Sequence, residues 1–131
     1  MIKVVLDTNI LVSALWTHIG NPSKIVDMFF TDKIYVYYNL KIMEEYQDVL
    51  TRPKLNFPSE KISWLLNRIK EKGILINAEK STISMIDETD RKFYDTAKTA
   101  GAILITGNIK HYSGESFIVS PADFIQKQIQ R

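Results

Sequence analysis

The fold is decided by the first ten residues, Met1-Ile2-Lys3-Val4-Val5-Leu6-Asp7-Thr8-Asn9-Ile10. The run Ile2–Leu6 is short, apolar and rich in β-branched residues, which is typical of a strand buried on both faces. The run ends abruptly in Asp7. In an open parallel α/β sheet the carboxyl ends of the strands form the ligand crevice, so Asp7 is predicted to lie at its mouth. The alternative is that Asp7 only caps the helix that follows.

The composition is that of one ordinary soluble domain, spanning residues 1–131. Apolar residues make up 45% of the chain and charged residues 24%, with a net charge of +2 and a pI of about 8.8. The chain has no cysteine, which excludes disulfides and thiolate metal sites but leaves oxygen-ligand sites open. No stretch is as long and apolar as a membrane span, and no signal peptide is recognisable, so we expect a cytoplasmic protein.

Apolar runs and helical stripes alternate along the chain, which predicts an α/β fold: a central parallel sheet of four to five strands flanked by helices in three layers. Breakers such as Gly20, Pro53 and Gly73 separate the elements. The strands are expected at 2–6, 34–38, 74–76, 102–105 and 117–119. The helices are expected at 8–15, 23–30, 39–51, 58–73, from 87 to 101, and from 120 to the end. The segment 80–85 is either a strand or irregular.

The helix predicted after Asn39 carries one acid at the edge of its buried face. Its apolar stripe has helical spacing, and Glu45 lies about 100° from the centre of that stripe. Glu44 lies about 160° away and Asp48 is also well off the stripe, so both are expected to point to solvent. Glu45 is therefore the acid that this helix offers to an interior cleft, unless it is a solvated surface acid.

The helix predicted from residue 87 brings a second acid inward. Asp90 falls about 30° from the centre of its apolar face, whereas Asp95 falls on the opposite side. An inward acid is costly unless it is paired or metal-bound. A capping role for Asp90 competes with this interpretation, and Asp87 is better placed to cap than to catalyse.

Asp7, Glu45, Asp90 and Asn108 are predicted to face one pocket. Asn108 closes the strand 102–105 as Asp7 closes the first strand, and these two strands are expected to be neighbours at the topological switch point. Three carboxylates in one pocket stay ionised together only around a cation. The oxygen-rich ligand set fits Mg²⁺ or Mn²⁺, and such an ion activates water for attack on phosphate. The residues alone therefore point to a metal-dependent phosphodiesterase or nuclease.

Four motifs follow one another in order along the chain: Val-Val-Leu-Asp7-Thr-Asn-Ile, Ile-Met-Glu-Glu45-Tyr-Gln-Asp-Val-Leu-Thr-Arg-Pro-Lys, Asp87-Glu-Thr-Asp90-Arg-Lys-Phe and Leu-Ile-Thr106-Gly-Asn108-Ile-Lys-His-Tyr. In this order the motifs resemble those of the PIN-domain family of nucleases. The resemblance covers nearly the whole chain and is strongest to the VapC-like toxins of toxin–antitoxin systems.

The resemblance implies a PIN-like fold whose acidic cleft binds Mg²⁺ or Mn²⁺ and cuts single-stranded RNA. Asp7, Glu45 and Asp90 match the first three acids of the family. The fourth position, often Asp, is Asn108 here, which offers an oxygen but no charge. Thr8 and Thr106 match small hydroxyl positions that support the metal ligands; the family also implies a homodimer and a cognate antitoxin protein.

Arg52, Lys54, Lys110 and His111 follow elements that end near the predicted mouth and are candidates to bind RNA phosphates, although each fits a solvated surface charge as well. Tyr112 is a candidate to stack on a base. Trp16 and Trp64 are expected in the core or in a dimer contact.

Two other functions compete with the nuclease. A PIN-like module that binds RNA or protein without cutting would explain Asn108. A receiver-type phosphate switch also places Asp at strand ends, but it needs a Lys at the end of a late strand, where this chain has Thr106-Gly-Asn108.

Overall fold

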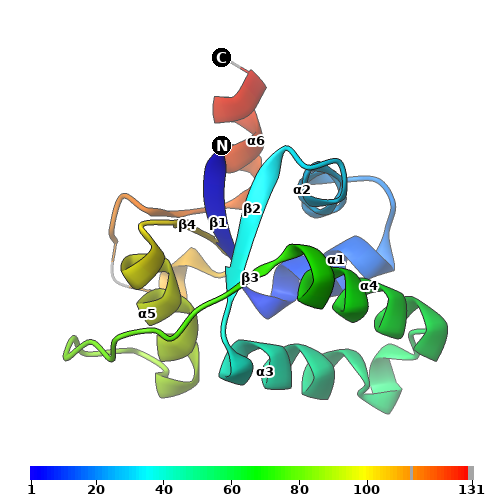
Figure 1. Ribbon diagram of the computed structural model, residues 1–131, viewed down its shortest axis with the longest axis horizontal. Helices are drawn as coiled ribbons and strands as arrows, with labels where there is room; N and C mark the ends of the chain where they lie inside the picture. The colour runs from blue at the N-terminus through cyan, green and yellow to red at the C-terminus, as the bar shows by residue number, and fades with distance from the viewer. Residues whose placement is uncertain (113, 130–131) are drawn as a thin grey trace.

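The computed structural model describes residues 1–112 and 114–129, and shows five parallel strands in the order β3-β2-β1-β4-β5 (Figure 1). The predicted parallel sheet is confirmed. The strands are β1 (Ile2–Leu6), β2 (Ile34–Tyr38), β3 (Ile74–Leu75), β4 (Ile103–Ile105) and β5 (Ile118–Val119). The α-helices are α1 (Thr8–Trp16), α2 (Asn21–Phe30), α3 (Leu40–Leu50), α4 (Ser59–Lys72), α5 (Arg91–Ala100) and α6 (Pro121–Ile129). Residues 130 and 131, predicted to continue the last helix, lie outside the described residues.

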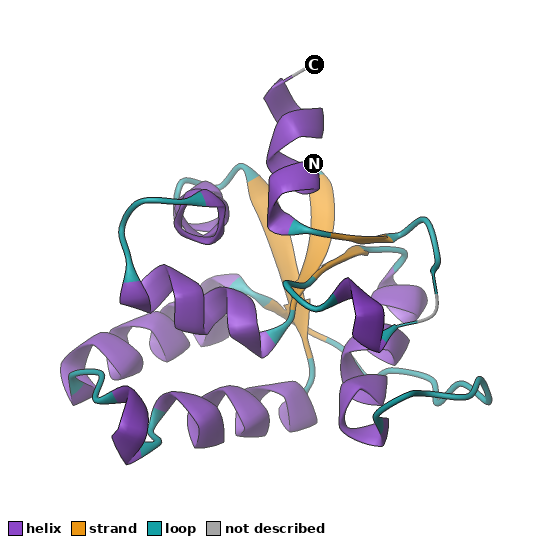
Figure 2. Ribbon diagram, turned by 180° about the vertical axis from the view of Figure 1, so that it is seen from behind, coloured by secondary structure: helices purple, strands orange, loops and turns teal. Residues whose placement is uncertain are grey.

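The helices form layers on both sides of the sheet. Helix α5 covers one face, and α1, α2 and α4 lie on the other side (Figure 2). Helix α3 lies across the carboxyl end of the sheet and contacts α1, α4 and α5 (Figure 1). Among the described residues, no helix combines the length and apolar character needed to cross a bilayer.

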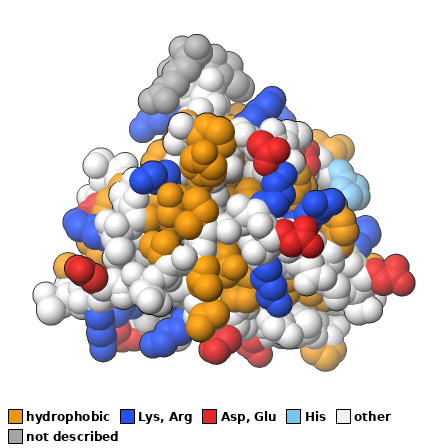
Figure 3. All heavy atoms as spheres, viewed as in Figure 1, with side chains coloured by type: hydrophobic (Ala, Val, Ile, Leu, Met, Phe, Trp, Pro, Cys, Tyr) orange, Lys and Arg blue, Asp and Glu red, His pale blue; other side chains and the backbone are white. Residues whose placement is uncertain are grey.

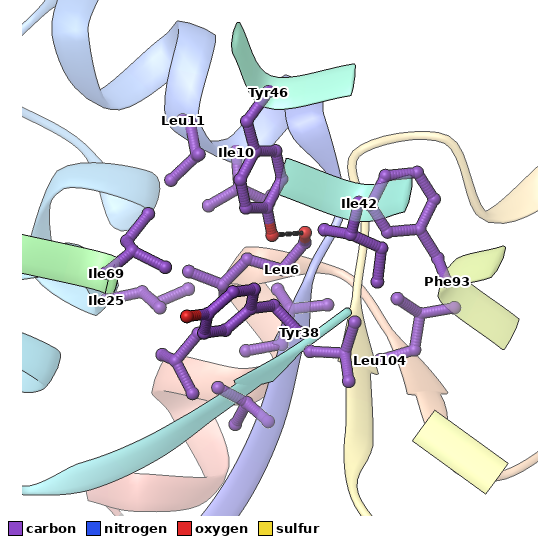
Figure 4. Close-up of a cluster of buried hydrophobic side chains, with 14 of the residues drawn as sticks. Leu6, Ile10, Leu11, Ile25, Tyr38, Ile42, Tyr46, Ile69, Phe93 and Leu104 are labelled. Atoms are coloured by element: carbon purple, nitrogen blue, oxygen red, sulfur yellow. Dashed lines mark hydrogen bonds between the residues drawn. The ribbon is translucent and has the colours of Figure 1, made fainter. Parts of the chain in front are cut away.

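Strand β1 forms the centre of the core because it is paired on both edges. Val4, Val5 and Leu6 are no more than 1% exposed, as expected for a short continuous apolar run between two helical layers. Figure 4 shows the cluster around Leu6, where the Tyr46 hydroxyl donates a hydrogen bond of 2.5 Å to the Leu6 carbonyl. This bond ties α3 to the last residue of β1 and so fixes α3 at the carboxyl edge of the sheet.

Most element boundaries differ from the predictions by one or two residues, but the helix expected from residue 87 begins differently. A 3₁₀ turn, η2 (Glu88–Asp90), comes first, and α5 begins at Arg91. The Asp87 side chain accepts hydrogen bonds from the amide and hydroxyl of Thr89, so the predicted capping role of Asp87 is confirmed. The segment 80–85 is irregular rather than a strand.

One acid does not lie where the sequence pattern put it, and two tryptophans lie outside the core. Asp95, predicted on the solvent side of its helix, is only 5% exposed. The segment after β3 packs over that side of α5: the Glu79 amide donates to Thr99 Oγ1. Trp16 and Trp64, expected in the core or in a dimer contact, are 65% and 52% exposed, so they lie outside the core and the dimer contact stays a prediction.

Candidate functional site

Asp7 lies where β1 and β4 end side by side. Leu6 pairs with Ile105 in the parallel register, so the next residues along the chain, Asp7 and Thr106, are adjacent. Thr106 Oγ1 donates to Asp7 Oδ2 at 2.7 Å, and the Tyr112 hydroxyl donates to the same oxygen at 3.2 Å. The carboxylate is 7% exposed. The predicted adjacency of the first strand and the strand before Thr106 is thus confirmed.

Burial raises the pKa of the Asp7 carboxyl above its usual range. The hydrogen bonds from Thr106, from Tyr112 and from the Thr8 backbone act in the opposite direction because they stabilise the ionised form. The negative charge of Glu45 raises the pKa further. A cation is strongly favoured beside a buried carboxylate that is repelled by a second carboxylate, because the cation compensates both negative charges.

Glu45 projects from the middle of α3 and is half-buried, whereas Glu44 and Asp48 are exposed, as predicted. Both of its carboxylate oxygens have a partner. Thr8 Oγ1 donates to Oε2, and Lys92 Nζ lies 2.7 Å from Oε1. In this arrangement the charge of Glu45 is balanced by an ammonium group from α5.

Asp90 is the residue immediately before α5, and its side chain is 14% exposed. Its Oδ2 is buried and accepts no hydrogen bond from any residue that the structure describes, although His111 Nδ1 lies 3.4 Å away. The pKa of Asp90 is raised to about 6, mainly by burial and then by the charges of Asp7 and Asp87; Glu45 adds to this and His111 opposes it. Asp90 is therefore repelled by the other acids, and within residues 1–112 and 114–129 its nearest cationic candidate is the imidazole of His111.

The remaining predicted site residues surround this group. Thr8 and Thr106 are buried, and Thr106 Oγ1 accepts a hydrogen bond of 3.0 Å from the Asn108 amide. The Asn108 side chain is exposed. Across residues 1–112 and 114–129, no three His, Cys, Asp or Glu side chains are gathered closely enough to hold a metal ion. The charges of these acids nevertheless act on one another, while Lys92 and Thr8 contact Glu45 and Thr106 contacts Asp7.

The four candidate RNA-binding residues fall into two groups. Lys110 and His111 form the exposed 3₁₀ turn η3 (Ile109–His111) beside Asp90. Arg52 and Lys54 follow the end of α3 that points away from α5 (Figure 1), and Arg52 pairs with Asp48 at 3.2 Å. Lys, Arg, Asp and Glu side chains are mixed over the face in Figure 3, so no single sign of charge dominates it.

The structure reveals three polar side chains at the site that the sequence analysis missed or misassigned. Tyr112, expected to stack on a base, is 5% exposed and bonded to Asp7. Lys92 was not singled out because its contact with Glu45 joins two helices that no sequence periodicity connects. Asn9 Oδ1 accepts from the Gly107 amide at 3.0 Å, and a Cβ at Gly107 would lie 3.3 Å from that oxygen. The only available signal for Asn9 was its place directly after the first strand.

Comparisons with known proteins agree with this fold. The chain is 36% identical over 110 residues to the uncharacterized protein MJ1680 of Methanocaldococcus jannaschii. The aligned region covers 82% of this chain and 71% of that protein. The fold of this chain is similar to that of PAE2754 from Pyrobaculum aerophilum, with a TM-score of 0.62, 11% identity, and coverage of 99% of this chain and 91% of the other.

A second solved structure with a similar fold is VapBC2 from Rickettsia felis, bound to a DNA fragment from its promoter. The TM-score is 0.59 at 17% identity, covering 91% of this chain and 97% of the other. Residues 3–110 also match the family model described as the PIN domain. The match spans the end of β1, the helix with Glu45, the start of α5 and the turn after β4, and the chain therefore belongs to the PIN domain family.

Proposed function

We propose that this chain is a Mg²⁺- or Mn²⁺-dependent endoribonuclease that cuts single-stranded RNA, and that it is the toxin of a toxin–antitoxin pair. The observation that carries the proposal is the environment of Asp90. Its pKa is raised to about 6 by burial and by Asp7, Asp87 and Glu45, and its Oδ2 has no hydrogen-bond partner in the described part of the chain. A divalent cation between Asp7 and Asp90 would relieve both the repulsion and the missing contact.

The residues fit such an ion in their chemistry. The available donors are carboxylate, amide and hydroxyl oxygens, which Mg²⁺ and Mn²⁺ prefer. Asp7 and Asp90 would hold the ion, and Glu45 would join them once Lys92 moves aside. Asn108 would contribute a neutral oxygen, and Thr8 and Thr106 would orient the carboxylates to which they donate.

When bound, the ion would polarise the phosphate and lower the pKa of an attacking water. The residues of the chain would supply position and charge. Lys110 and His111, exposed beside Asp90, would bind phosphates on either side of the cut, and the released Lys92 ammonium would add positive charge at the same place. Arg52 and Lys54 would contact RNA farther along the strand.

The decisive experiment compares cleavage of single-stranded RNA by the wild-type protein, Asp7→Asn and Asp90→Asn in Mn²⁺ and in EDTA. We expect cleavage only by the wild type and only with the metal, whereas the control Asp27→Asn, an exposed acid of α2, cuts normally. Double-stranded RNA and single-stranded DNA test the substrate class. Full activity of both site variants, or equal activity in EDTA, would remove the proposal.

A PIN-like module that binds without cutting is the second candidate. It is favoured by the fact that both oxygens of Glu45 already have partners and that position 108 carries no charge. Mn²⁺ titration separates the two functions. An absence of both metal binding and cleavage, together with retained RNA binding, would support the module.

The partners that we propose are a cognate antitoxin and a second copy of this chain. The similarity of fold to VapBC2 supports the antitoxin. Expression of the chain alone should arrest growth, and co-expression of a small protein from the neighbouring reading frame should restore it. Sedimentation equilibrium tests the homodimer; growth that is unaffected by the active chain would refute the toxin role.

A further inference from the structure

Asp95 is a buried acid that the proposed nuclease chemistry leaves unused. It is 5% exposed, its Oδ1 is buried, and it makes no hydrogen bond or ion pair within the described part of the chain. Arg91, one helical turn earlier on α5, donates instead to Glu88 and to the carbonyls of Ser81 and Ile83. A buried carboxylate without donors is costly, so Asp95 is a site to which a ligand with N–H groups can contribute them.

A cavity of about 500 Å³ opens beside Asp95. Its walls come from the start of α3, from residues 77–80 and from the first turns of α5; the segment after β3 runs across α5 at this point (Figure 1). Lys92, which pairs with Glu45, also lines this cavity. The cavity therefore adjoins the acidic site, and its volume is in the range of small-ligand pockets.

The polar groups of the cavity suit a ligand that carries both an anionic group and hydrogen-bond donors. Lys41 and Lys80 line the cavity and have no ion pair among the described residues. Leu40, 66% exposed, adds an apolar surface against which a flat ring can lie. These lysines would repel a divalent cation, but they suit a phosphate while Asp95 receives the donors of a base.

We propose, building on the nuclease function above, that this cavity binds a guanine nucleotide of the RNA close to the bond that is cut, with the Asp95 carboxylate accepting from the base. Guanine carries two parallel donors, N1–H and the 2-amino group, that match the two oxygens of a carboxylate; to receive both, the Asp95 carboxyl must turn so that the buried Oδ1 faces the cavity. Adenine and cytosine each present an acceptor nitrogen beside the amino group, and uracil flanks its N–H with two carbonyls. Unpaired bases in single strands expose this edge.

Titration with mononucleotides in EDTA tests the site without metal or cleavage. By NMR chemical shifts, we expect GMP to bind at least about fivefold more tightly than AMP, CMP or UMP, the low end for a bidentate base contact. Inosine monophosphate, which lacks the 2-amino group, should bind with intermediate affinity. Asp95→Asn should lose most of the preference for GMP, whereas the control Asp27→Asn should keep it.

Lys41→Gln provides a variant at an exposed position that does not touch the core. It should weaken all four nucleotides by a similar factor, because it removes a phosphate contact and leaves the base contact. If Asp95→Asn does not fold, the wild-type comparison of GMP with inosine monophosphate and the Lys41 variant decide the question.

The outcomes separate this inference from the proposed function. Equal affinity for GMP and UMP in the wild type, or an undiminished preference in folded Asp95→Asn, would overturn the guanine site even if the protein cuts RNA. Binding of GMP that depends on Asp95, with no RNA cleavage under any condition, would keep the nucleotide site and remove the nuclease.

Discussion

Asp90, the residue immediately before α5, should lower the stability of the metal-free protein. The substitution Asp90→Asn should therefore stabilise it. The substitution keeps the shape of the side chain and removes its charge. It also removes the repulsion from Asp7, Asp87 and Glu45 that contributes to the raised pKa of Asp90. The role proposed above for Asp90 as a metal ligand would account for such a cost in the metal-free protein.

The size of the effect follows from the pKa. A rise from 3.8 to about 6 corresponds to roughly 3 kcal/mol for full ionisation of Asp90 in the folded state. The side chain is 14% exposed and its surroundings relax, so we expect a gain of about 1–2 kcal/mol in the free energy of unfolding for Asp90→Asn at pH 7.5.

The raised pKa of Asp90 also determines in which direction the stability changes with pH. Because the folded pKa is raised, the folded state binds the proton more tightly than the unfolded state, so the wild type loses stability as the pH rises from 3.8 through about 6. The advantage of Asp90→Asn should be full above pH 7 and vanish near pH 3.5. His111 lies 3.4 Å from Asp90 and opposes the shift, so the series is repeated in a His111→Gln background.

Urea unfolding in EDTA, followed by circular dichroism from pH 3.5 to 8, measures this directly. The matched control is Asp27→Asn, an exposed acid without an ion pair in the described residues. The reasoning fails if Asp90→Asn is no more stable than the wild type at pH 7.5, or if its gain does not shrink on acidification. With saturating Mn²⁺ the order should reverse, because the wild type alone gains binding energy.

Three further predictions concern substitutions of single residues. Lys92→Gln should tighten Mn²⁺ binding about tenfold, measured by calorimetry, because it removes the ammonium group that pairs with the Glu45 carboxylate. An unchanged affinity would contradict a role for Glu45 in metal binding. Tyr112→Phe removes a hydrogen bond to ionised Asp7 worth about 1.5 kcal/mol, so the pH midpoint for Mn²⁺ binding should rise by up to about one unit; no change would mean that the contact is weak. Gly101→Ala should cost about 1 kcal/mol in urea unfolding, because residue 101 has a φ of +66°, and should leave Mn²⁺ affinity unchanged.

The buried strands and the adjacency of Asp7 and Thr106 could be predicted from the sequence. Short apolar runs bounded by Gly, Pro and acids identify buried strands, and the topological switch point expected in an open parallel sheet places the first strand beside the strand before Thr106. The half-buried position of Glu45 followed in the same way from the stripe of one amphipathic helix.

The positions of Asp95, Lys92 and Tyr112 could not be predicted because each depends on contacts between distant segments. Asp95 is covered by the irregular segment after β3, which has no periodicity that would place it on α5. Lys92 reaches across to Glu45 of α3, and Tyr112, directly after the 3₁₀ turn η3, points inward to Asp7. An amphipathic pattern defines the face that a helix buries against the sheet, but not what later covers the other faces.

The central place of β1 has a consequence for synthesis of the protein on the ribosome. The hydroxyl partners of Asp7, Thr106 and Tyr112, follow it 99 and 105 residues later along the chain. Until β4 emerges, one edge of β1 has no strand to pair with, and such non-local pairing is slow to form. In a nascent chain the surroundings of Asp7 therefore stay incomplete until both β4 and Tyr112 have been made.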